Sequence, residues 1–278
     1  GDPVMLMLPA DASPTQIERL REQLGFNDPL PVQYWRFVTH AVRGDFGKSL
    51  YYHIPALKLI AERLPASLEL ALAAMVIALA ASVPIGIISA VRRGSAVDMA
   101  SMLVALFGLS MPHFWLGIML ILLFSVKLGW LPTSGRGSFA QLIMPALALG
   151  LSLMAMFARL TRSVMLEVLS LDYVRTARAK GLRERIVIGK HALKNALIPL
   201  VTVAGMQFGF LLGGTVVIET VFAWPGVGRL VVQAIFNRDY PLVQAAVFIL
   251  ALIFVAVNLF VDILYLYLDP QIRYVDEQ

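Results

Sequence analysis

Residues 70–91 read LALAAMVIALAASVPIGIISAV and contain no Asp, Glu, Lys or Arg. A helix rises about 1.5 Å per residue, so about 20 apolar residues cross a hydrocarbon layer that is about 30 Å thick. Helices in the core of a water-soluble protein seldom stay uncharged over such a length. The stretch therefore predicts a helix that spans a membrane.

Four further stretches are comparably long and equally free of charged residues. The composition agrees with them, because 59% of the 278 residues are hydrophobic and only 15% are charged. A soluble globule of this size needs more polar surface than that. We therefore predict an all-α, polytopic membrane protein in which residues 66–268 form the transmembrane domain. Its five predicted spans are Leu70–Val91, Met99–Val126, Gly137–Ala158, Asn195–Ile218 and Tyr240–Val261.

The basic residues in the connections predict the orientation. The first connection begins with two Arg residues, and the third carries nine Lys or Arg residues between Arg159 and Lys194. Loops rich in Lys and Arg remain in the cytoplasm. Residues 1–65 then form an extracytoplasmic segment and residues 269–278 a cytoplasmic tail. Because a polar segment that starts outside must be carried across the membrane, we expect a further helix ahead of it, which makes six in the full protein.

The extracytoplasmic segment carries helix signals of its own. Ser13 and Pro14 begin a predicted helix that ends at Gly25, with Ser13 as its N-cap. Tyr34 and Trp35 belong to a second amphipathic element, which we place near the lipid headgroups because aromatic rings favour that layer. The segment is either a small outer cap or a docking surface for a partner that delivers solute.

Several kinds of chemistry are excluded by the sequence. The chain has no cysteine, so it forms no disulfide, no thiolate metal site and no cysteine nucleophile. It contains no GxxxxGK(S/T) phosphate loop, no HExxH motif and no GxSxG motif. The net charge of +5 is spread over membrane-flanking segments, which does not indicate nucleic-acid binding. We therefore predict neither an enzyme nor a chain with a metal or cofactor of its own.

A few residues inside the spans differ from their apolar surroundings. Gly205, Gly209 and Gly213 are spaced four apart on one helix face, which predicts close packing against another helix. Polar side chains within a bilayer usually face protein or water. Glu219 and Asp262 border their spans, and we assign no role to them. The polar candidates for facing a translocation pathway, with helix packing as the alternative, are His113, Gln207 and Asn258.

The loop at residues 166–196 is the most informative part of the chain. The stretch 169–200 reads LSLDYVRTARAKGLRERIVIGKHALKNALIPL, which predicts a helix, a turn and a second helix. Asp172 is placed to cap the first helix, and Gly181 to end it in a left-handed conformation. Ala177 and Gly181 are small and have basic neighbours, which suits insertion into a groove on another protein. The alternative is that the loop only supplies positive charge and contacts to lipid headgroups.

This loop resembles the coupling motif of ABC importer permeases, in which Glu-Ala-Ala is followed by three residues, Gly and a distal Leu-Pro. Arg175, Thr176 and Ala177 hold the places of Glu-Ala-Ala, and Gly181 holds the place of the glycine. Arg175 replaces the acidic residue, and the distal Ile-Pro at 198–199 lies farther along than usual. Both departures are similar to the pattern of the dipeptide, oligopeptide and nickel permeases, in which sequences close to DYVRTARAKG and HALKNALIPL recur.

The resemblance covers nearly the whole chain. It includes GDPV near the start, LREQLGFNDPLPVQYWRF, GDFGKSL, ETVFAWPGVGRL at 219–230 and RDYPLVQ at 238–244. It implies a multi-pass permease subunit of a bacterial inner membrane, which forms half of an ATP-driven import pathway for small peptides. Nickel or glutathione-like solutes are alternatives. An ion-coupled secondary transporter is a different class, which should show internal repeats and paired intramembrane carboxylates.

The same resemblance implies the partners. These are a second permease, expected to be a paralogue, two cytoplasmic ATPases that bind ATP and Mg²⁺, an extracytoplasmic solute-binding protein and membrane lipid. The loop is expected to contact the ATPase. Carried over by position, its coupling residues are Val174, Arg175, Ala177, Arg178, Gly181, Leu182 and Arg185.

Overall fold

A computed structural model describes residues 4, 8 and 12–268, so the predicted tail at 269–278 lies outside the described residues. The described part is helical, with one isolated β-bridge between Lys48 and Pro55. Its helices are α2 (Pro14–Leu24), α3 (Leu30–Val42), α4 (Ala56–Val91), α5 (Ala96–Ser110), α6 (His113–Leu120), η1 (Ile121–Lys127), α7 (Phe139–Leu169), α8 (Asp172–Ala179), α9 (Glu184–Ile186), η2 (Val187–Ala192), α10 (Leu193–Gly214), α11 (Val216–Val221), α12 (Val227–Phe236) and α13 (Tyr240–Leu268).

Four helical stretches of the described residues are long and apolar enough to cross a membrane, and a bent pair makes five if it counts as one span. The predicted span Met99–Val126 is wrong as a continuous helix, because α5 and the α6–η1 segment meet at 98°. Pro112 lacks the N–H that a continuing helix needs, and Met111 before it is extended, with a ψ of 126°. The four stretches are Ala56–Val91, Phe139–Leu169, Glu184–Gly214 and Tyr240–Ile263.

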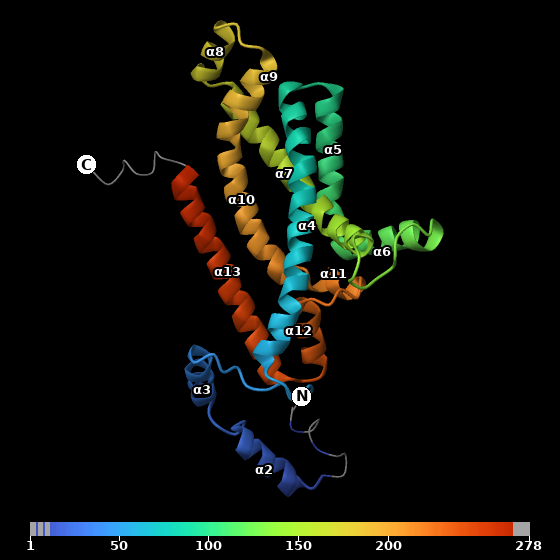
Figure 1. The fold of residues 1–278 in the computed structure, drawn as a ribbon, viewed down its shortest axis with the longest axis vertical. Helices are drawn as coiled ribbons and strands as arrows, with labels where there is room; N and C mark the ends of the chain where they lie inside the picture. Colours follow the sequence, from blue (N-terminus) through green and yellow to red (C-terminus); the bar gives the residue numbers. More distant parts are fainter. Residues whose placement is uncertain (1–3, 5–7, 9–11, 269–278) are drawn as a thin grey trace, which may run out of the picture.

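Two predicted spans have different ends in the structure. The third predicted span belongs to α7, which continues to Leu169 and carries charged residues in its last turns. A stretch without charges marks only the part of a helix that suits hydrocarbon, and the helix itself continues beyond it. The fourth predicted span ends early, because α10 stops at Gly214 and α11 starts at Val216 across the axis of the bundle (Figure 1).

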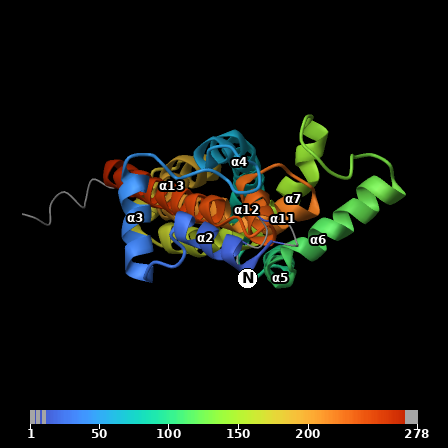
Figure 2. The same cartoon turned by 90° about the horizontal axis from the view of Figure 1, so that it is seen from below.

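The long helices α4, α7, α10 and α13 run along the longest axis of the molecule, together with α5 (Figure 1). Helices α8 and α9 lie at one end, and α2 and α3 lie at the other. The predicted topology requires this separation of the basic loop from the N-terminal segment. The α6–η1 segment projects sideways from the bundle, as the view along its axis shows (Figure 2).

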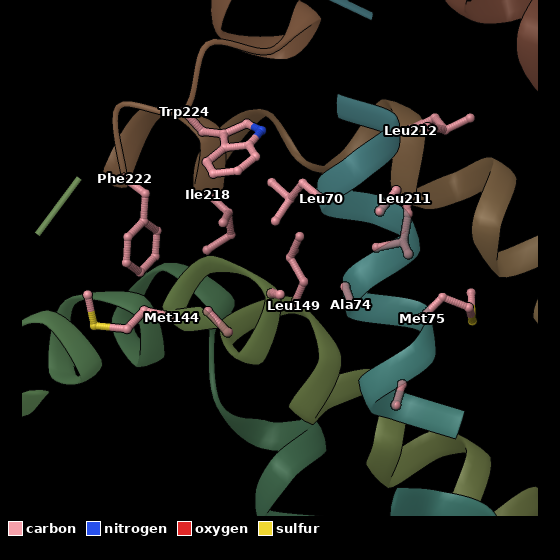
Figure 3. Packing of buried hydrophobic residues seen from close by; sticks show 14 of the residues in the cluster. Leu70, Ala74, Met75, Met144, Leu149, Leu211, Leu212, Ile218, Phe222 and Trp224 are labelled. Carbon is pink, nitrogen blue, oxygen red and sulfur yellow. The ribbon is translucent and has the colours of Figure 1, made fainter. Parts of the chain in front are cut away.

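The main core lies between α4, α7 and the chain around α11 (Figure 3). Leu70 and Ala74 of α4 lie beside Leu149 of α7, and Trp224 covers the cluster from the turn after α11. A Cβ added to Gly150 of α7 would lie 3.0 Å from the carbonyl oxygen of Ala74. The two helices therefore touch at the level of their backbones. Such close van der Waals packing holds helices together in a bilayer, where lipid is as apolar as the side chains.

The glycine face predicted on α10 packs against α13 over two of its three members. A Cβ added to Gly205 would lie 2.1 Å from Cγ2 of Val261, and one added to Gly209 would lie 3.0 Å from Cδ2 of Phe254. Gly213 packs against no helix of the described chain, because a Cβ there would meet nothing within 4 Å, and its packing against a second permease stays a prediction. It lies in the last turn of α10, where the chain is about to turn into α11.

The N-terminal helices form largely as the sequence predicts. Ser13 caps α2 in a capping box with Gln16, and Gly25 ends the helix with a φ of 70°. Phe37 of α3 packs edge-on against Phe248 of α13, with ring centroids 5.7 Å apart. The N-terminal segment therefore packs against α13, the last spanning helix.

A buried carboxylate fastens this segment to the start of α13. Asp239 accepts hydrogen bonds from the Ser49 hydroxyl and from the backbone N–H groups of Leu50, at 3.1 Å, and Tyr51, at 3.3 Å. It also accepts one from the N–H of Leu242 in the first turn of α13, at 3.3 Å. A negative charge is favoured there by the helix dipole. The carboxylate thus joins the GDFGKSL and RDYPLVQ stretches.

Candidate functional site

The basic loop forms a short helix between two long ones. Helix α8 follows α7 after two residues, and Gly181 ends the turn with a φ of 75°, as predicted. The prediction that Asp172 caps α8 is wrong, because the N-cap is Leu171 and no side chain caps the helix. Asp172 is the first helical residue, and its carboxylate lies 3.5 Å from the Arg175 guanidinium. Its charge still suits the positive end of the helix dipole.

One face of α8 lies against the protein's own core. Val174 is fully buried and Ala177 is 6% exposed, and both pack with Met165 of α7 and Val187 of η2. The expectation that Ala177 makes close contact with another protein is therefore corrected. Residues three apart share a helix face, and the structure uses that face to attach α8 to the bundle.

The outward surface of the loop is both basic and apolar. Leu182 is 37% exposed and Ile186 is 42% exposed, and the Arg175 side chain is 76% exposed. Gly181 and Arg185 are exposed beside them, and a Cβ added to Gly181 would meet nothing within 4 Å. We call Arg175, Gly181, Leu182, Arg185 and Ile186 the loop surface.

Polar contacts fix the shape of the loop. Nη2 of Arg178 donates to Oε1 of Glu184 at 2.7 Å, which ties α8 to α9, and this hydrogen bond raises the pKa of Arg178. At the other edge, Nδ2 of Asn195 donates to the Tyr173 hydroxyl at 2.7 Å. Arg178, predicted as a coupling residue, is thus partly engaged within the chain. The loop surface is held on a rigid base.

An ion pair connects α7 to the neighbouring helices near the same end of the bundle. Nε and Nη2 of Arg162 donate to the two oxygens of Asp98, at 2.6 and 2.8 Å. The Ser89 hydroxyl of α4 and the N–H of Gly94 donate to the same carboxylate. Sequence reasoning missed this cluster, since Arg162 lies 64 residues after Asp98 and only the fold brings them together. It joins the helix that enters the loop to α4 and α5.

Two of the three pathway candidates meet in one cavity. His113 and Gln207 line a cavity of about 390 Å³ beside the break between α5 and α6. Asn258 does not line it. Its Nδ2 donates to the carbonyl oxygen of Phe254 on the same helix at 2.8 Å, beside Gly209 of α10. Asn258 therefore packs beside α10 in the described chain, and its role in the pathway stays a prediction.

Glu219, for which no role was predicted, is a buried carboxylate. It accepts hydrogen bonds from the hydroxyls of Ser67 and Thr215, at 2.7 and 2.9 Å, and from the N–H of Arg229 at 2.9 Å. A Cβ added to Gly226 would lie 2.2 Å from its Oε1. The ETVFAWPGVGRL stretch contains a signal for this burial, because its two glycines leave room for the Glu219 side chain. Glu219 shapes the turn between α11 and α12.

No metal centre was predicted, and the described residues contain no group of three or more His, Asp or Glu side chains that could hold an ion. The candidate functional surfaces of the described chain are an exposed loop that is both basic and apolar, and a cavity among helices. Both suit a transport component.

Comparison with known proteins identifies the family. Residues 82–274 match the family described as "Binding-protein-dependent transport system inner membrane component". The chain belongs to this family. It is a multi-pass permease subunit of the inner membrane in an ABC importer, and it is not itself an enzyme. The resemblance carried by the coupling loop is therefore confirmed.

Relatives of known sequence match nearly the whole permease. The "Glutathione transport system permease protein GsiC" of Escherichia coli (strain K12) is 48% identical over 274 residues. The protein of the same name from Salmonella paratyphi A (strain ATCC 9150 / SARB42) is 47% identical. Each alignment covers 99% of this chain and 90% of the relative.

Solved structures share the fold at lower identity. A chain of the MetNI methionine ABC transporter, in inward facing conformations, aligns with a TM-score of 0.64 at 19% identity, over 77% of the permease and 97% of that chain. A chain of an amino acid ABC transporter with histidines aligns with a TM-score of 0.56 at 14% identity, over 75% of the permease and 94% of that chain. The architecture is therefore that of ABC importer permeases.

Proposed function

We propose that the permease forms one half of an ATP-driven import pathway for glutathione or closely related small peptides. The observation that carries this proposal is the 47–48% identity to glutathione transport permeases along almost the entire chain. It favours the glutathione-like alternative over the dipeptide and oligopeptide reading that came first from the sequence. The ion-coupled transporter is set aside by membership of the ABC importer family.

The complete transporter in this proposal has four kinds of subunit. A second permease, expected to be a paralogue, forms the other half of the pathway, and two cytoplasmic ATPases supply ATP and Mg²⁺ binding. A solute-binding protein delivers glutathione at the end that carries α2 and α3. The separation of that end from the loop surface supports this arrangement (Figure 1).

The loop surface is the proposed contact with the ATPase. Leu182 and Ile186 offer apolar groups for a groove, and Arg175 and Arg185 surround them with positive charge. The face of α8 that was first expected to contact the ATPase supports the coupling role by attaching α8 to the bundle. Because Val174 and Ala177 are packed against α7, a displacement of α8 is carried into the spanning helices.

Replacing Leu182 by Asp tests the contact. A charge placed in a desolvated groove should weaken binding of the ATPase subunits by about tenfold or more, which equals about 1.4 kcal/mol. The measurement is co-purification and titration of ATPase subunits with the assembled permease pair. Gly181→Trp is a poorer test, since the φ of 75° strains any other residue there.

The matched control is Leu30→Asp on α3, an exposed leucine at the opposite end of the molecule. It should leave ATPase binding unchanged. Equal binding by the native permease and Leu182→Asp would remove the loop surface from the proposed contact.

A further inference from the structure

The cavity beside the helix break has a mixed lining. It lies where α5 gives way to α6, against α7 and α10, and its volume is about 390 Å³. Cavities of roughly 300 Å³ and more hold small organic ligands, so this one suits a molecule of tripeptide size. Its lining has no Asp, Glu, Lys or Arg and includes Met111, His113, Ser152, Met156, Gln207 and Phe210.

His113 lines the cavity and uses one of its two ring nitrogens in a hydrogen bond with Ser152. Its Nδ1 lies 3.0 Å from the Ser152 hydroxyl of α7, which fixes the ring at the start of α6. Its Nε2 has no hydrogen-bond partner among the described residues, and the side chain is exposed. When the serine hydroxyl donates to Nδ1, Nε2 carries the proton and donates to an acceptor in the cavity.

Gln207 adds an acceptor and a second donor. Its Nε2 donates to the thioether sulfur of Met156 at 3.0 Å, and sulfur is a weak acceptor that an amide readily gives up. Its Oε1 has no donor within the described part of the chain. The cavity therefore offers N–H donors and one carbonyl acceptor, which complement the C=O and N–H groups of a peptide bond.

We propose that this cavity binds the transported solute during its passage, through the peptide groups of a small, tripeptide-like molecule. This inference rests on the proposed import function and adds a specificity site within the permease. The absence of charged side chains from its lining keeps binding weak, because no ion pair can form with the solute. A site on a conduction path must bind weakly enough to release.

Because the chain contains no cysteine, a single cysteine introduced into it can be modified selectively. His113→Cys and Gln207→Cys each introduce a single thiol into the cavity, and Ser134→Cys places one in the exposed loop before α7 as a control. The complete transporter is treated with a maleimide in the presence of binding protein that is either empty or loaded with S-methylglutathione, which has no free thiol. Modification of this chain is read from its mass.

We expect the solute to slow modification at positions 113 and 207 by about three- to tenfold and to leave position 134 unchanged. A solute that occupies the cavity for roughly two-thirds to nine-tenths of the time blocks the thiol for that share of the time. Unchanged rates at 113 and 207, in a complex whose native form transports glutathione, would overturn the inference and leave the import function standing. A native complex that does not take up glutathione would instead overturn the proposed function.

A second measurement does not depend on cysteine chemistry. Gln207→Ala should change the ratio of glutathione to dipeptide uptake by about threefold or more, since one hydrogen bond to the solute is lost. ATP hydrolysis stimulated by the loaded binding protein should persist. Thr202→Ala on the same helix, whose hydroxyl bonds to the carbonyl of Ile198, is the control that should leave the ratio unchanged. An unchanged ratio in Gln207→Ala would contradict a solute contact there.

Discussion

At the scale of single residues, the structure is held by carboxylates that the sequence places at the borders of spans. Glu219, Asp239 and Asp98 are each buried and each accept several hydrogen bonds. Two of them, Glu219 and Asp239, receive donors from the first turn of a helix, where the dipole favours negative charge. Buried charges therefore fix the turns of this permease, and the apolar spans fill the space between them.

Glu219→Gln should destabilise the turn between α11 and α12. The amide nitrogen of Gln would face hydroxyl and backbone donors that now share a carboxylate, so at least one buried donor loses its acceptor. The expected cost is about 1–3 kcal/mol in the free energy of unfolding. Thermal unfolding of the purified permease in detergent measures it.

Thr220→Ala is the neighbouring control, since its exposed hydroxyl bonds only to the carbonyl of Val216 in its own helix. An unfolding temperature for Glu219→Gln that equals that of the control would refute the structural role of the carboxylate.

At the scale of elements, hydropathy located the spans but not their shapes. Charge-free stretches predicted where four long helices cross, because the bilayer imposes a length on each of them. They could not predict the 98° bend at Met111 and Pro112, since a proline in a span either kinks or breaks it. Local signals correctly predicted the N-cap at Ser13 and the left-handed Gly181, but they failed at Asp172, which is the first helical residue of α8 and not its cap.

Which residues share a face of α8 could be predicted, but what that face contacts could not. The spacing of three residues puts Val174 and Ala177 on one side of α8. It could not decide whether that side meets a partner or the chain's own core, because small residues suit both. The packing with Met165 and Val187 decides this, and these residues join the face only in three dimensions.

Gly205→Leu should separate α10 from α13, because even a Cβ at this position lies 2.1 Å from Val261. Overpacking of this kind costs about 1–3 kcal/mol. Gly213→Leu is the matched control on the same helix, where a Cβ meets nothing within 4 Å. Thermal unfolding should show a loss for the first variant only, and Val261→Ala should restore part of it in the double variant. Equal losses at both glycines would contradict the packing.

At the scale of the whole molecule, the fold places the basic loop with α8 and a segment of two short helices at opposite ends of one bundle (Figure 1). Buried contacts attach each end to the spans, through α8 at one end and Asp239 at the other. A subunit that passes motion from an ATPase to a solute pathway needs such rigid attachment. The cavity with His113 and Gln207 lies between the two ends, beside the broken helix.

The candidate site could be predicted only in part. Motif spacing predicted the coupling loop, since the loop is continuous in sequence. The cavity joins residues from three helices, so His113 and Gln207 could be named as candidates but not brought together. Asp98 and Arg162 escaped notice because charged residues at span borders are ordinary in membrane proteins, and only the fold shows which of them meet.

The most direct measurement is uptake of labelled glutathione into proteoliposomes that contain the complete transporter with its binding protein. We expect uptake that requires ATP on the side of the membrane that carries the ATPases. Glutathione-like peptides should compete for this uptake more strongly than unrelated dipeptides do. Uptake that proceeds without ATP under an ion gradient, or transport of dipeptides with none of glutathione, would contradict the account.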